Sequence, residues 1–261
     1  MGEKMIHALI DADSIYFRAA YVAKKENEIR KIIDKTMREI ESQVAGVGFD
    51  DVQLRTAVKG KGNFRKDYWP FYKDHRKELD EEMKKALNFG HTYMMDKWNG
   101  VMADGMEADD LVSIWAYEAR DMEEQYVVVG IDKDLLQIPG NHYRFVKPKN
   151  GDQHVFVDDN TAHHNLMVQC LTGDNADNIP GIKGIGPVKA KKILGDIPAY
   201  KRWSRVQAAW RGYKAGDPRV SYRLLSMIKT WEEFDGIKAE CETLIGKQNV
   251  LPKQEQDSRV S

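Results

Sequence analysis

Eight acidic residues of this chain stand where strands are expected to end or where helices and turns are expected to begin. They are Asp11, Glu107, Asp109, Asp110, Asp132, Asp134, Asp174 and Asp177. Carboxylates that converge on one crevice repel one another and do not stay ionised there without cations. Oxygen ligands without histidine or cysteine suit Mg²⁺ or Mn²⁺ better than zinc. The acids therefore predict two Mg²⁺ ions roughly 4 Å apart, with Mn²⁺ able to substitute, an arrangement suited to phosphodiester hydrolysis.

Each group of acids also has an ordinary structural explanation when it is taken alone. The three acids of "MEADD" (106–110) could satisfy a helix N-terminus, "IDKD" (131–134) could be a polar turn, and "GDNADN" (173–178) could form Asx-turns. Asp11 is the hardest to explain in this way, because a charge at the end of a buried strand has no structural motive. The occurrence of all the groups at matching positions favours a metal site.

The elements that must position these acids alternate along the first part of the chain. Strands are expected at 5–11, 51–58 and 125–130, with shorter ones near 143–147 and 154–157. Helices are expected at 13–25, 26–46, 79–98 and from about 106 to 120, and only helices and turns from about 161 onward. This alternation predicts an α/β domain, 1–160, with a mostly parallel central sheet flanked by helices, and a helical region, 161–261. Chemistry in such sheets gathers beyond the carboxyl ends of the strands.

Basic and aromatic residues alternate in the segment 58–77, which has no clean periodicity. Positive side chains for the backbone and aromatic faces for the bases are what single-stranded nucleic acid requires. Lys59, Lys61 and Arg65 are therefore DNA-binding candidates. Lys73 and Arg76 are catalytic candidates, because they would share one face if 72–78 is helical. The alternative is a solvated basic loop whose aromatic side chains turn inward.

A glycine-rich turn follows the last acids, in "GIKGIGPVKAKKIL" (181–194). Gly184 and Gly186 leave room for a phosphate backbone, and the free N–H groups of the next helix would point at the anion. Four lysines surround the turn and supply charge without base information: Lys183, Lys189, Lys191 and Lys192. An ordinary packing turn is the alternative, but the lysines favour phosphate binding.

Overall composition excludes some classes of protein. The net charge of −1 and the pI of about 6.7 do not by themselves indicate nucleic acid, although a near-neutral sum can hide a basic surface around an acidic hole. No apolar run approaches the roughly 20 residues that span a bilayer, and the N-terminus does not resemble a signal peptide. Cys170 and Cys241 make neither a disulfide framework nor a zinc site. We therefore expect a cytoplasmic monomer that does not bind membranes.

Five motifs in order resemble the flap endonuclease/5′-to-3′ exonuclease family, especially its bacteriophage members. They are "LIDADS", "YKDHR", "MEADD", "VVVGIDKD" and "GDNADNIPGIKGIGPVKA", and the resemblance covers about residues 5–195. It implies a PIN-like core, a helical arch (within 59–98) over the active site, and a helix–three-turn–helix DNA-binding motif. It also implies metal-dependent cleavage at 5′ ends, flaps or nicks of DNA during replication or repair. RNA primers or an RNA/DNA hybrid are a further possible substrate, and replication proteins would act in trans.

The resemblance also assigns roles to individual residues. The first metal region would be held by Asp11, Glu107, Asp109, Asp110 and Asp132, and the second by Asp134, Asp174 and Asp177, with Asp132 nearby. Lys73 and Arg76 match a basic pair that contacts the scissile phosphate, and Tyr72 matches an aromatic near the DNA end. The turn at Gly184–Gly186 would grip duplex phosphates, and in relatives it can hold a K⁺ ion.

One departure from the family concerns the second strand. The family usually carries an aspartate at its end, whereas here Val58 or a neighbour takes that place and no acid occurs between Val52 and Lys66. Asp51 lies at the wrong end of the strand, and Asp67 follows too late. The first metal site is therefore expected to be weaker or rearranged, with the "MEADD" acids carrying more of the coordination.

Two other readings of the sequence remain open. In a haloacid-dehalogenase-type phosphatase, Asp11 would be the phosphorylated nucleophile and Asp13 the general acid. That reading leaves "MEADD" and the lysine-rich turn unexplained, and it expects Thr or Val where Ile15 stands. A non-catalytic DNA-binding module would use only the glycine turn and would leave the acids without a purpose.

Overall fold

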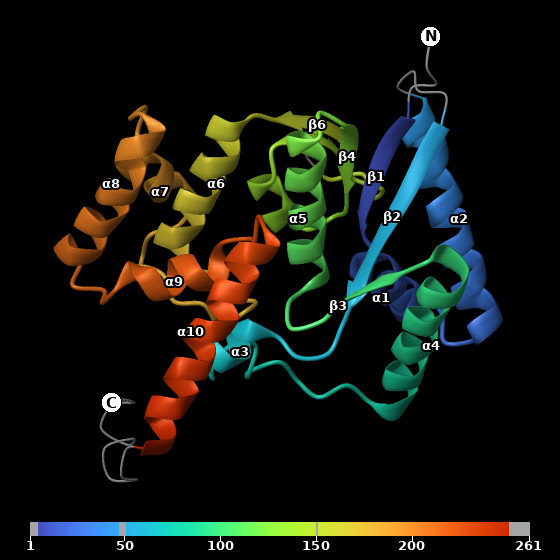
Figure 1. The fold of residues 1–261 in the computed structure, drawn as a ribbon, viewed down its shortest axis with the longest axis horizontal. Coiled ribbons are helices and arrows are strands. Elements are labelled where there is room, and N and C mark those ends of the chain that lie inside the picture. The colour runs from blue at the N-terminus through green and yellow to red at the C-terminus, as the bar shows by residue number, and fades with distance from the viewer. Residues whose placement is uncertain (1–4, 47–50, 150, 251–261) are drawn as a thin grey trace.

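A single six-stranded sheet organises the first part of the chain in the computed structural model, which describes residues 5–46, 51–149 and 151–250. The strand order is β3-β2-β1-β4-β5-β6 (Figure 1). The strands are β1 (Met5–Asp11), β2 (Asp51–Lys59), β3 (Val101–Ala103), β4 (Gln125–Val129), β5 (Gly140–Tyr143) and β6 (His154–Val157). Neighbouring strands are parallel except for β5 and β6. The predicted mostly parallel sheet is confirmed.

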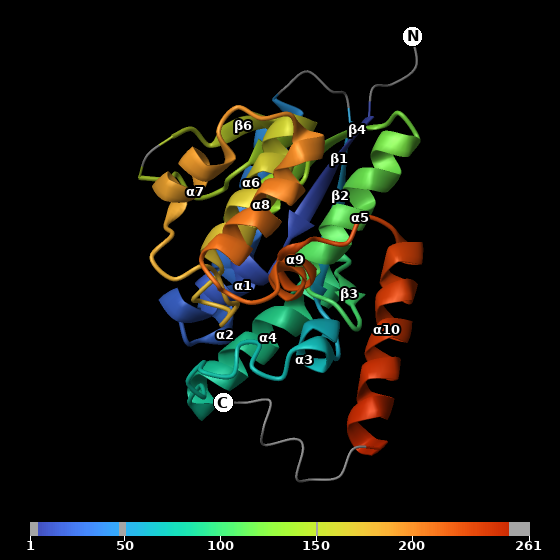
Figure 2. The ribbon, with the colours of Figure 1, turned by 90° about the vertical axis from the view of Figure 1, so that its left-hand side faces the viewer.

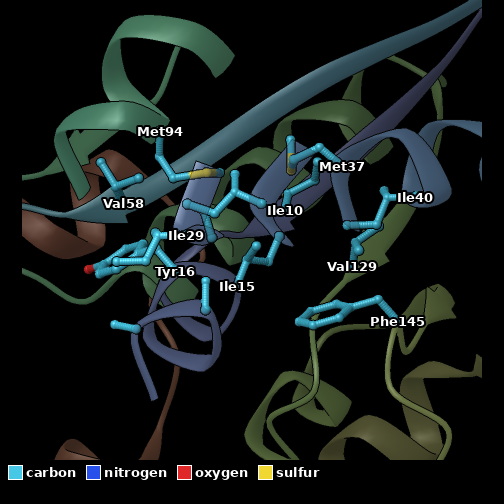
Figure 3. Packing of buried hydrophobic residues seen from close by; sticks show 14 of the residues in the cluster. Ile10, Ile15, Tyr16, Ile29, Met37, Ile40, Val58, Met94, Val129 and Phe145 are labelled. Atoms are coloured by element: carbon cyan, nitrogen blue, oxygen red, sulfur yellow. The ribbon is translucent and has the colours of Figure 1, made fainter. Parts of the chain in front are cut away.

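Helices cover both faces of this sheet, because successive residues of a buried strand point to opposite sides. On one face Ile10 of β1 and Val58 of β2 join a core with α1 (Asp13–Val22), α2 (Glu26–Ala45) and α4 (Glu81–Trp98) (Figure 3). On the other face Leu9 and Ala57 contact residues of α5 (Ala108–Asp121) and α10 (Trp231–Val250). Strands β1 and β2 pair in parallel register, with Asp11 opposite Ala57, so their carboxyl ends lie at the same edge of the sheet.

The helical region has a core of its own. It comprises α6 (Asp159–Thr172), α7 (Pro187–Leu194), α8 (Ala199–Gly212) and α9 (Pro218–Leu225), seen side by side in Figure 2. The fully buried Trp210 packs at its centre and donates its indole N–H to the Cys170 carbonyl at 2.9 Å. Among the helices of the described residues, none is long and apolar enough to cross a membrane.

Three local predictions differ from the structure. Strand β3 was not predicted, because three residues are too short to show a period. Strand β5 lies at 140–143 rather than 143–147. In the arch region, the short helix α3 (Phe64–Tyr68) begins where the Asn63 side chain accepts from the Arg65 N–H. The segment 69–80 is irregular, with turns over 70–75, so the helix on which a shared face of Lys73 and Arg76 depended does not form.

Candidate active site

A crevice of about 1020 Å³ opens beyond the carboxyl ends of β1, β2 and β4. Seven of the eight predicted acids line it, together with Lys73 and Arg76: Asp11, Glu107, Asp109, Asp132, Asp134, Asp174 and Asp177. Residues 107 and 109 reach it from the start of α5, residues 132 and 134 from the loop after β4, and residues 174 and 177 from the loop after α6. The parallel sheet therefore brings acids from four separate segments to one edge.

Asp11 lies on the floor of the crevice, at the end of β1. It is only 6% exposed, and Gly130 at the end of β4 makes room beside it. A Cβ at position 130 would lie 2.2 Å from Leu135 Cδ1, so a larger residue would displace Leu135, and it would lie 3.5 Å from Asp11 Cβ, in van der Waals contact. Burial raises the pKa of Asp11 to about 8, and the carboxylates of Asp13 and Asp132 add to the effect.

Asp109 carries an oxygen that the described part of the protein does not satisfy. Its Oδ1 is shielded from solvent and has no hydrogen-bond partner among the described residues. Burial, with Asp110 and Glu107 nearby, raises the pKa of Asp109 well above its usual range. Buried polar atoms are normally paired, so an orphaned carboxylate oxygen in an acidic crevice fits a bound cation.

Basic side chains neutralise several of the other acids. Lys73 Nζ contacts Glu107 Oε1 and lies 3.4 Å from Asp177 Oδ2, and Arg76 Nη2 lies 2.6 Å from Asp177 Oδ1. Burial would raise the pKa of Glu107, but the positive charges of Arg65 and Lys73 outweigh it and lower that pKa. The two predicted catalytic residues are therefore placed directly against the acids.

Lys133 neutralises one further acid, although it was not among the predicted site residues. Its Nζ lies 2.8 Å from Asp174 Oδ2, and this contact lowers the pKa of Asp174 against the effect of burial. The "IDKD" sequence, which sets a lysine between two crevice acids, was the available signal. Within the described ranges 5–46, 51–149 and 151–250, no three histidine, cysteine or acidic side chains are grouped so as to hold a metal ion.

A strained turn rather than a helix presents Lys73 and Arg76. Lys73 has a φ of +57°, which is unusual for a residue with a Cβ, and its N–H donates to the Asp177 carbonyl at 3.0 Å. The Arg76 N–H donates to the Lys73 carbonyl at 3.3 Å and closes the turn. Backbone strain of this kind is often found at functional sites, where surrounding contacts enforce it.

The prediction that Asp110 is a metal ligand is wrong. Its side chain is fully buried and is not part of the crevice wall. Its Oδ2 accepts from Arg65 Nη1 at 2.5 Å and from the Glu107 N–H at 3.1 Å, and its Oδ1 accepts from Arg65 Nη2 at 2.9 Å. One residue along a helix turns the side chain by about 100°, so Asp110 points into the protein while Asp109 points toward the crevice. The ordinary interpretation, an acid at a helix start, is correct for this residue.

Two of the predicted DNA contacts are buried in the crevice wall and paired with acids. Arg65 is 3% exposed, and its guanidinium is held by Asp110, so it is not available to DNA. Tyr72 is 2% exposed, and its hydroxyl donates to Glu107 Oε2 at 2.8 Å and to Asp177 Oδ2 at 3.2 Å. Lys59 lines the crevice with an exposed side chain, whereas Lys61 is exposed outside it.

The side chain of Asp13, the first residue of α1, lies at the end of β2, where an aspartate was expected from the sequence and none occurs. Val58 is fully buried in the core beside Met94 (Figure 3) and contributes nothing to the crevice. Asp13 instead reaches from the start of α1 and accepts the N–H of Lys59 at 2.8 Å and the hydroxyl of Tyr16 at 2.8 Å. It lines the crevice beside Asp11, and burial raises its pKa. The D-x-D spacing of "LIDADS" was the signal, considered only for the phosphatase.

The glycine turn is open to solvent, away from the crevice. Gly184 has a φ of +78°, Gly186 directly precedes α7, and a Cβ at either position would meet nothing within 4 Å. Lys189 Nζ donates to the Gly184 carbonyl at 3.0 Å. All four predicted lysines are exposed: Lys183, Lys189, Lys191 and Lys192. The turn therefore offers a bare backbone surrounded by positive charge.

Burial of the acids makes the stability of the metal-free protein depend on pH. Asp11 stays neutral in the folded state until about pH 8, whereas it ionises in the unfolded chain near pH 4. The unfolded chain thus binds fewer protons, so the free energy of unfolding falls as the pH rises between these values. Asp134, whose pKa burial raises to about 7, acts in the same direction over the lower part of the window.

Replacing Asp11 by asparagine is therefore expected to flatten this fall between about pH 5 and pH 8. The measurement is the free energy of unfolding in urea with EDTA, compared between wild type and Asp11→Asn at each pH. Groups that do not interact with Asp11 cancel in that comparison, so the difference reports Asp11 together with the carboxylates of Asp13 and Asp132 that interact with it. Asp121→Asn, at the exposed end of α5, should keep the wild-type slope. An identical slope in Asp11→Asn would contradict the burial argument.

Comparison with known proteins gives one family and one fold. Residues 7–166, over half of the chain, match the family described as "5'-3' exonuclease, N-terminal resolvase-like domain". DNA polymerase I of Rhizobium leguminosarum is 33% identical over 145 residues, which cover 51% of this chain and 14% of that protein. Flap endonuclease Xni of Vibrio atlanticus is 29% identical over 148 residues, which cover 52% of this chain and 55% of that protein. The matched regions thus span about half or less of these relatives.

A solved structure is similar over nearly the whole chain. It is T5 5'-exonuclease with bound divalent metal ions (zinc), with a TM-score of 0.61, 14% sequence identity, and coverage of 92% of this chain and 99% of that chain. At this identity the likeness shows the fold, including the helical region that the family match does not cover.

Proposed function

Because the chain belongs to the family of the 5'-3' exonuclease N-terminal resolvase-like domain, we propose that it is a divalent-metal-dependent 5′ nuclease. It would hydrolyse phosphodiester bonds at 5′ ends, flaps or nicks of DNA during replication or repair. The observation that carries this proposal is the crevice itself. Seven predicted acids and two basic residues line it, and one buried acid oxygen has no partner among the described residues. The names of the relatives, a DNA polymerase I and a flap endonuclease, agree with this activity.

We assign the crevice acids to two groups, each of which would hold one divalent cation. Asp11, Glu107 and Asp109 would hold one ion, and Asp134, Asp174 and Asp177 the other, with Asp132 between the groups. Asp13 is an added member of the first group, because it lies at the end of β2. When bound, such ions supply a water activated at neutral pH and stabilise the leaving oxygen. We propose Mg²⁺ as the natural ion and Mn²⁺ as a substitute.

The protein's own groups contribute charge and position. The Lys73 ammonium and the Arg76 guanidinium line the crevice beside Glu107 and Asp177. They would donate hydrogen bonds to the oxygens of the scissile phosphate and so offset the charge that develops during cleavage. The hydroxyl of Tyr72 lies between Glu107 and Asp177, one acid from each group, and holds them in place.

Substrate binding would be shared between the two predicted regions. The region 1–160, with the arch segments of 59–98, would act on the 5′ single-stranded end, which Lys59 and Lys61 would contact. The region 161–261 would grip the duplex through the glycine turn, where a K⁺ ion could assist. We further propose that the protein acts as a monomer in the cytoplasm, that it accepts RNA/DNA hybrids, and that replication proteins assist in trans.

The direct test is incubation of a 5′-labelled flap duplex with Mg²⁺, with product length read on a gel. Products as long as the flap indicate endonuclease cleavage, and mononucleotides indicate exonuclease cleavage. The same substrate in EDTA should remain intact. If the protein binds the duplex but does not cleave it, the DNA-binding module is favoured. If it releases phosphate from a phosphate monoester and does not cleave the flap duplex, the phosphatase is favoured. That last reading is already weakened, because Asp13 Oδ1 is engaged by Lys59 and Tyr16.

Substitution of Gly186 by alanine tests the role of the glycine turn. The added methyl group meets nothing within 4 Å in the free protein, so it should cause no steric clash. Gly186 is the N-cap of α7, where alanine is less favourable than glycine, so a small loss of stability of about 0.5–1 kcal/mol is expected. If a phosphate backbone approaches the turn closely, the same methyl group should weaken duplex binding by about 10-fold, as a loss of roughly 1.4 kcal/mol implies. Fluorescence anisotropy with a labelled duplex measures the Kd.

Gly236→Ala is the matched control, because position 236 in α10 is also open and exposed. It should leave duplex binding unchanged. Lys189→Ala and Lys191→Ala should weaken binding and reduce its dependence on salt, because each lysine at a phosphate displaces counterions. Wild-type affinity in Gly186→Ala, with an unaltered salt slope in the lysine variants, would show that the turn is structural only.

A further inference from the structure

The segment 224–228, from the end of α9 to the residues before α10, lies between the two groups of acids. It belongs to the part of the chain beyond the family match, and α9 runs between α6 and α10 (Figure 1). Leu224, Leu225 and Met227 nevertheless line the crevice. Every residue of the segment is buried. Buried backbone groups need hydrogen-bond partners, and five of those in this segment are paired with side chains that also contact the crevice acids or their neighbours.

One connection leads from this segment to the first group of acids. Arg65 Nε donates to the Leu224 carbonyl at 2.8 Å, and its Nη2 lies 3.3 Å from the Ser226 carbonyl. The same guanidinium forms the bidentate pair with Asp110, which also accepts the Ile228 N–H at 3.3 Å. Asp110 in turn accepts the Glu107 N–H. The start of α5, which presents Glu107 and Asp109, is thus tied to the segment 224–228.

A second connection leads to the other group. Gln137 Nε2 donates to the Leu225 carbonyl at 2.9 Å, and Gln137 Oε1 accepts the Met227 N–H at 3.4 Å. Gln137 also contacts Gln169, with Nε2 and Oε1 2.5 Å apart. The Gln169 amide then donates to Asp134 Oδ1. Asp134 is therefore held through two glutamines from the opposite side of the same segment.

We propose that the segment 224–228 sets the separation of the two acid groups, with Arg65 and Gln137 as positioning residues for metal-dependent cleavage. The inference rests on the proposed function, since it concerns acids that would bind two ions. All of these contacts use backbone atoms of the segment, so they depend on the side chains of Arg65 and Gln137 rather than on those of the segment itself. Outer partners of metal ligands commonly change metal affinity 10- to 100-fold when they are removed.

The test is Mn²⁺ binding by titration calorimetry, which does not depend on activity. Gln137→Met keeps the size of the side chain and removes its hydrogen bonds, and Arg65→Lys keeps the positive charge and removes the bidentate geometry. Each variant is expected to weaken one of two Mn²⁺ ions by about 10-fold. In an Asp134→Asn background, which lacks the second group, Arg65→Lys should still weaken the remaining ion and Gln137→Met should not.

Ile33→Val is the control for stability alone. Ile33 is fully buried in α2 and does not line the crevice. The variant should lower the melting temperature and leave both Mn²⁺ affinities as in wild type. The spin coupling between the two Mn²⁺ ions, read by electron paramagnetic resonance, should change in Gln137→Met and Arg65→Lys and not in Ile33→Val.

The outcomes separate the inference from the proposed function. If wild type binds two Mn²⁺ ions and both positioning variants behave like Ile33→Val, the inference is overturned and the proposed function stands. If wild type binds no Mn²⁺, the proposed function fails and the inference fails with it. Should Arg65→Lys fail to fold, the Gln137→Met comparison, with and without Asp134→Asn, decides the question.

Discussion

Replacing Asp109 by asparagine is expected to slow Mg²⁺-dependent flap cleavage by at least about 100-fold and, in EDTA at neutral pH, to raise the melting temperature. The two effects have one cause. In the metal-free protein Asp109 Oδ1 is buried without a partner among the described residues, and burial raises its pKa well above the usual range, so the carboxyl destabilises the fold. An amide removes that cost and also removes a ligand that a divalent ion requires. Cleavage kinetics and thermal denaturation in EDTA measure the two effects.

Asp121→Asn provides the matched control on the same helix. Asp121 is exposed in the last turn of α5, at the far end from Asp109. The same change of charge at position 121 should leave the cleavage rate and the melting temperature close to those of wild type. If Asp109→Asn lowered the melting temperature in EDTA, Asp109 would be a structural acid, and the orphaned oxygen would no longer support a metal site.

Replacing Lys73 by alanine is expected to lower the single-turnover cleavage rate by roughly 100- to 1000-fold, the range seen when one group that stabilises transition-state charge is removed. Lys73 contacts Glu107 of one acid group and lies near Asp177 of the other. A phosphate bound by the two divalent ions would therefore lie close to its ammonium. Mn²⁺ binding should be as tight as in wild type or tighter, because a competing cation is removed from Glu107. Rapid-quench kinetics and calorimetry measure the two effects.

Lys77→Ala is the control for this change. Lys77 follows in the same segment, and its side chain is exposed and does not line the crevice. Its removal should leave the single-turnover rate near that of wild type. A wild-type rate in Lys73→Ala would exclude it from the reaction, whereas loss of Mn²⁺ binding would show that Lys73 holds the acids in place rather than acting on the phosphate.

The two variants together separate metal binding from phosphate activation. Asp109→Asn should lose both ion binding and cleavage, while Lys73→Ala should lose only cleavage. Lys73 carries a positive φ, which a residue with a Cβ adopts only when other contacts enforce it. The contact of its N–H with the Asp177 carbonyl supplies one such constraint, so the backbone conformation should survive the loss of the side chain.

The crevice could be predicted from the sequence because each of the patterns that predict it lies within a short stretch of the chain. A buried strand that ends in Asp11, another followed by "GIDKD", and a helix that begins with "MEADD" are each visible in a short stretch. Parallel strands end at the same edge of a sheet, so acids placed after them must lie near one another. The sequence alone thus determined the sheet, the crevice and seven of its acids.

Only the tertiary structure decided which of two neighbouring acids lines the crevice and which forms a buried ion pair. Asp110 and Arg65 are 45 residues apart, and Arg65 and Ser226 are 161 residues apart, so no local pattern announces their contacts. Successive residues of a helix differ by about 100° in direction, so Asp109 points to the crevice and Asp110 into the protein. Asp110 forms an ion pair only because folding places Arg65 beside it. Asp13 takes the place left by Val58 for the same reason, since the start of α1 lies against the end of β2 in space. Residue types and their spacing fix the chemistry that is available, whereas the burial and pairing of each charge depend on segments that folding brings together.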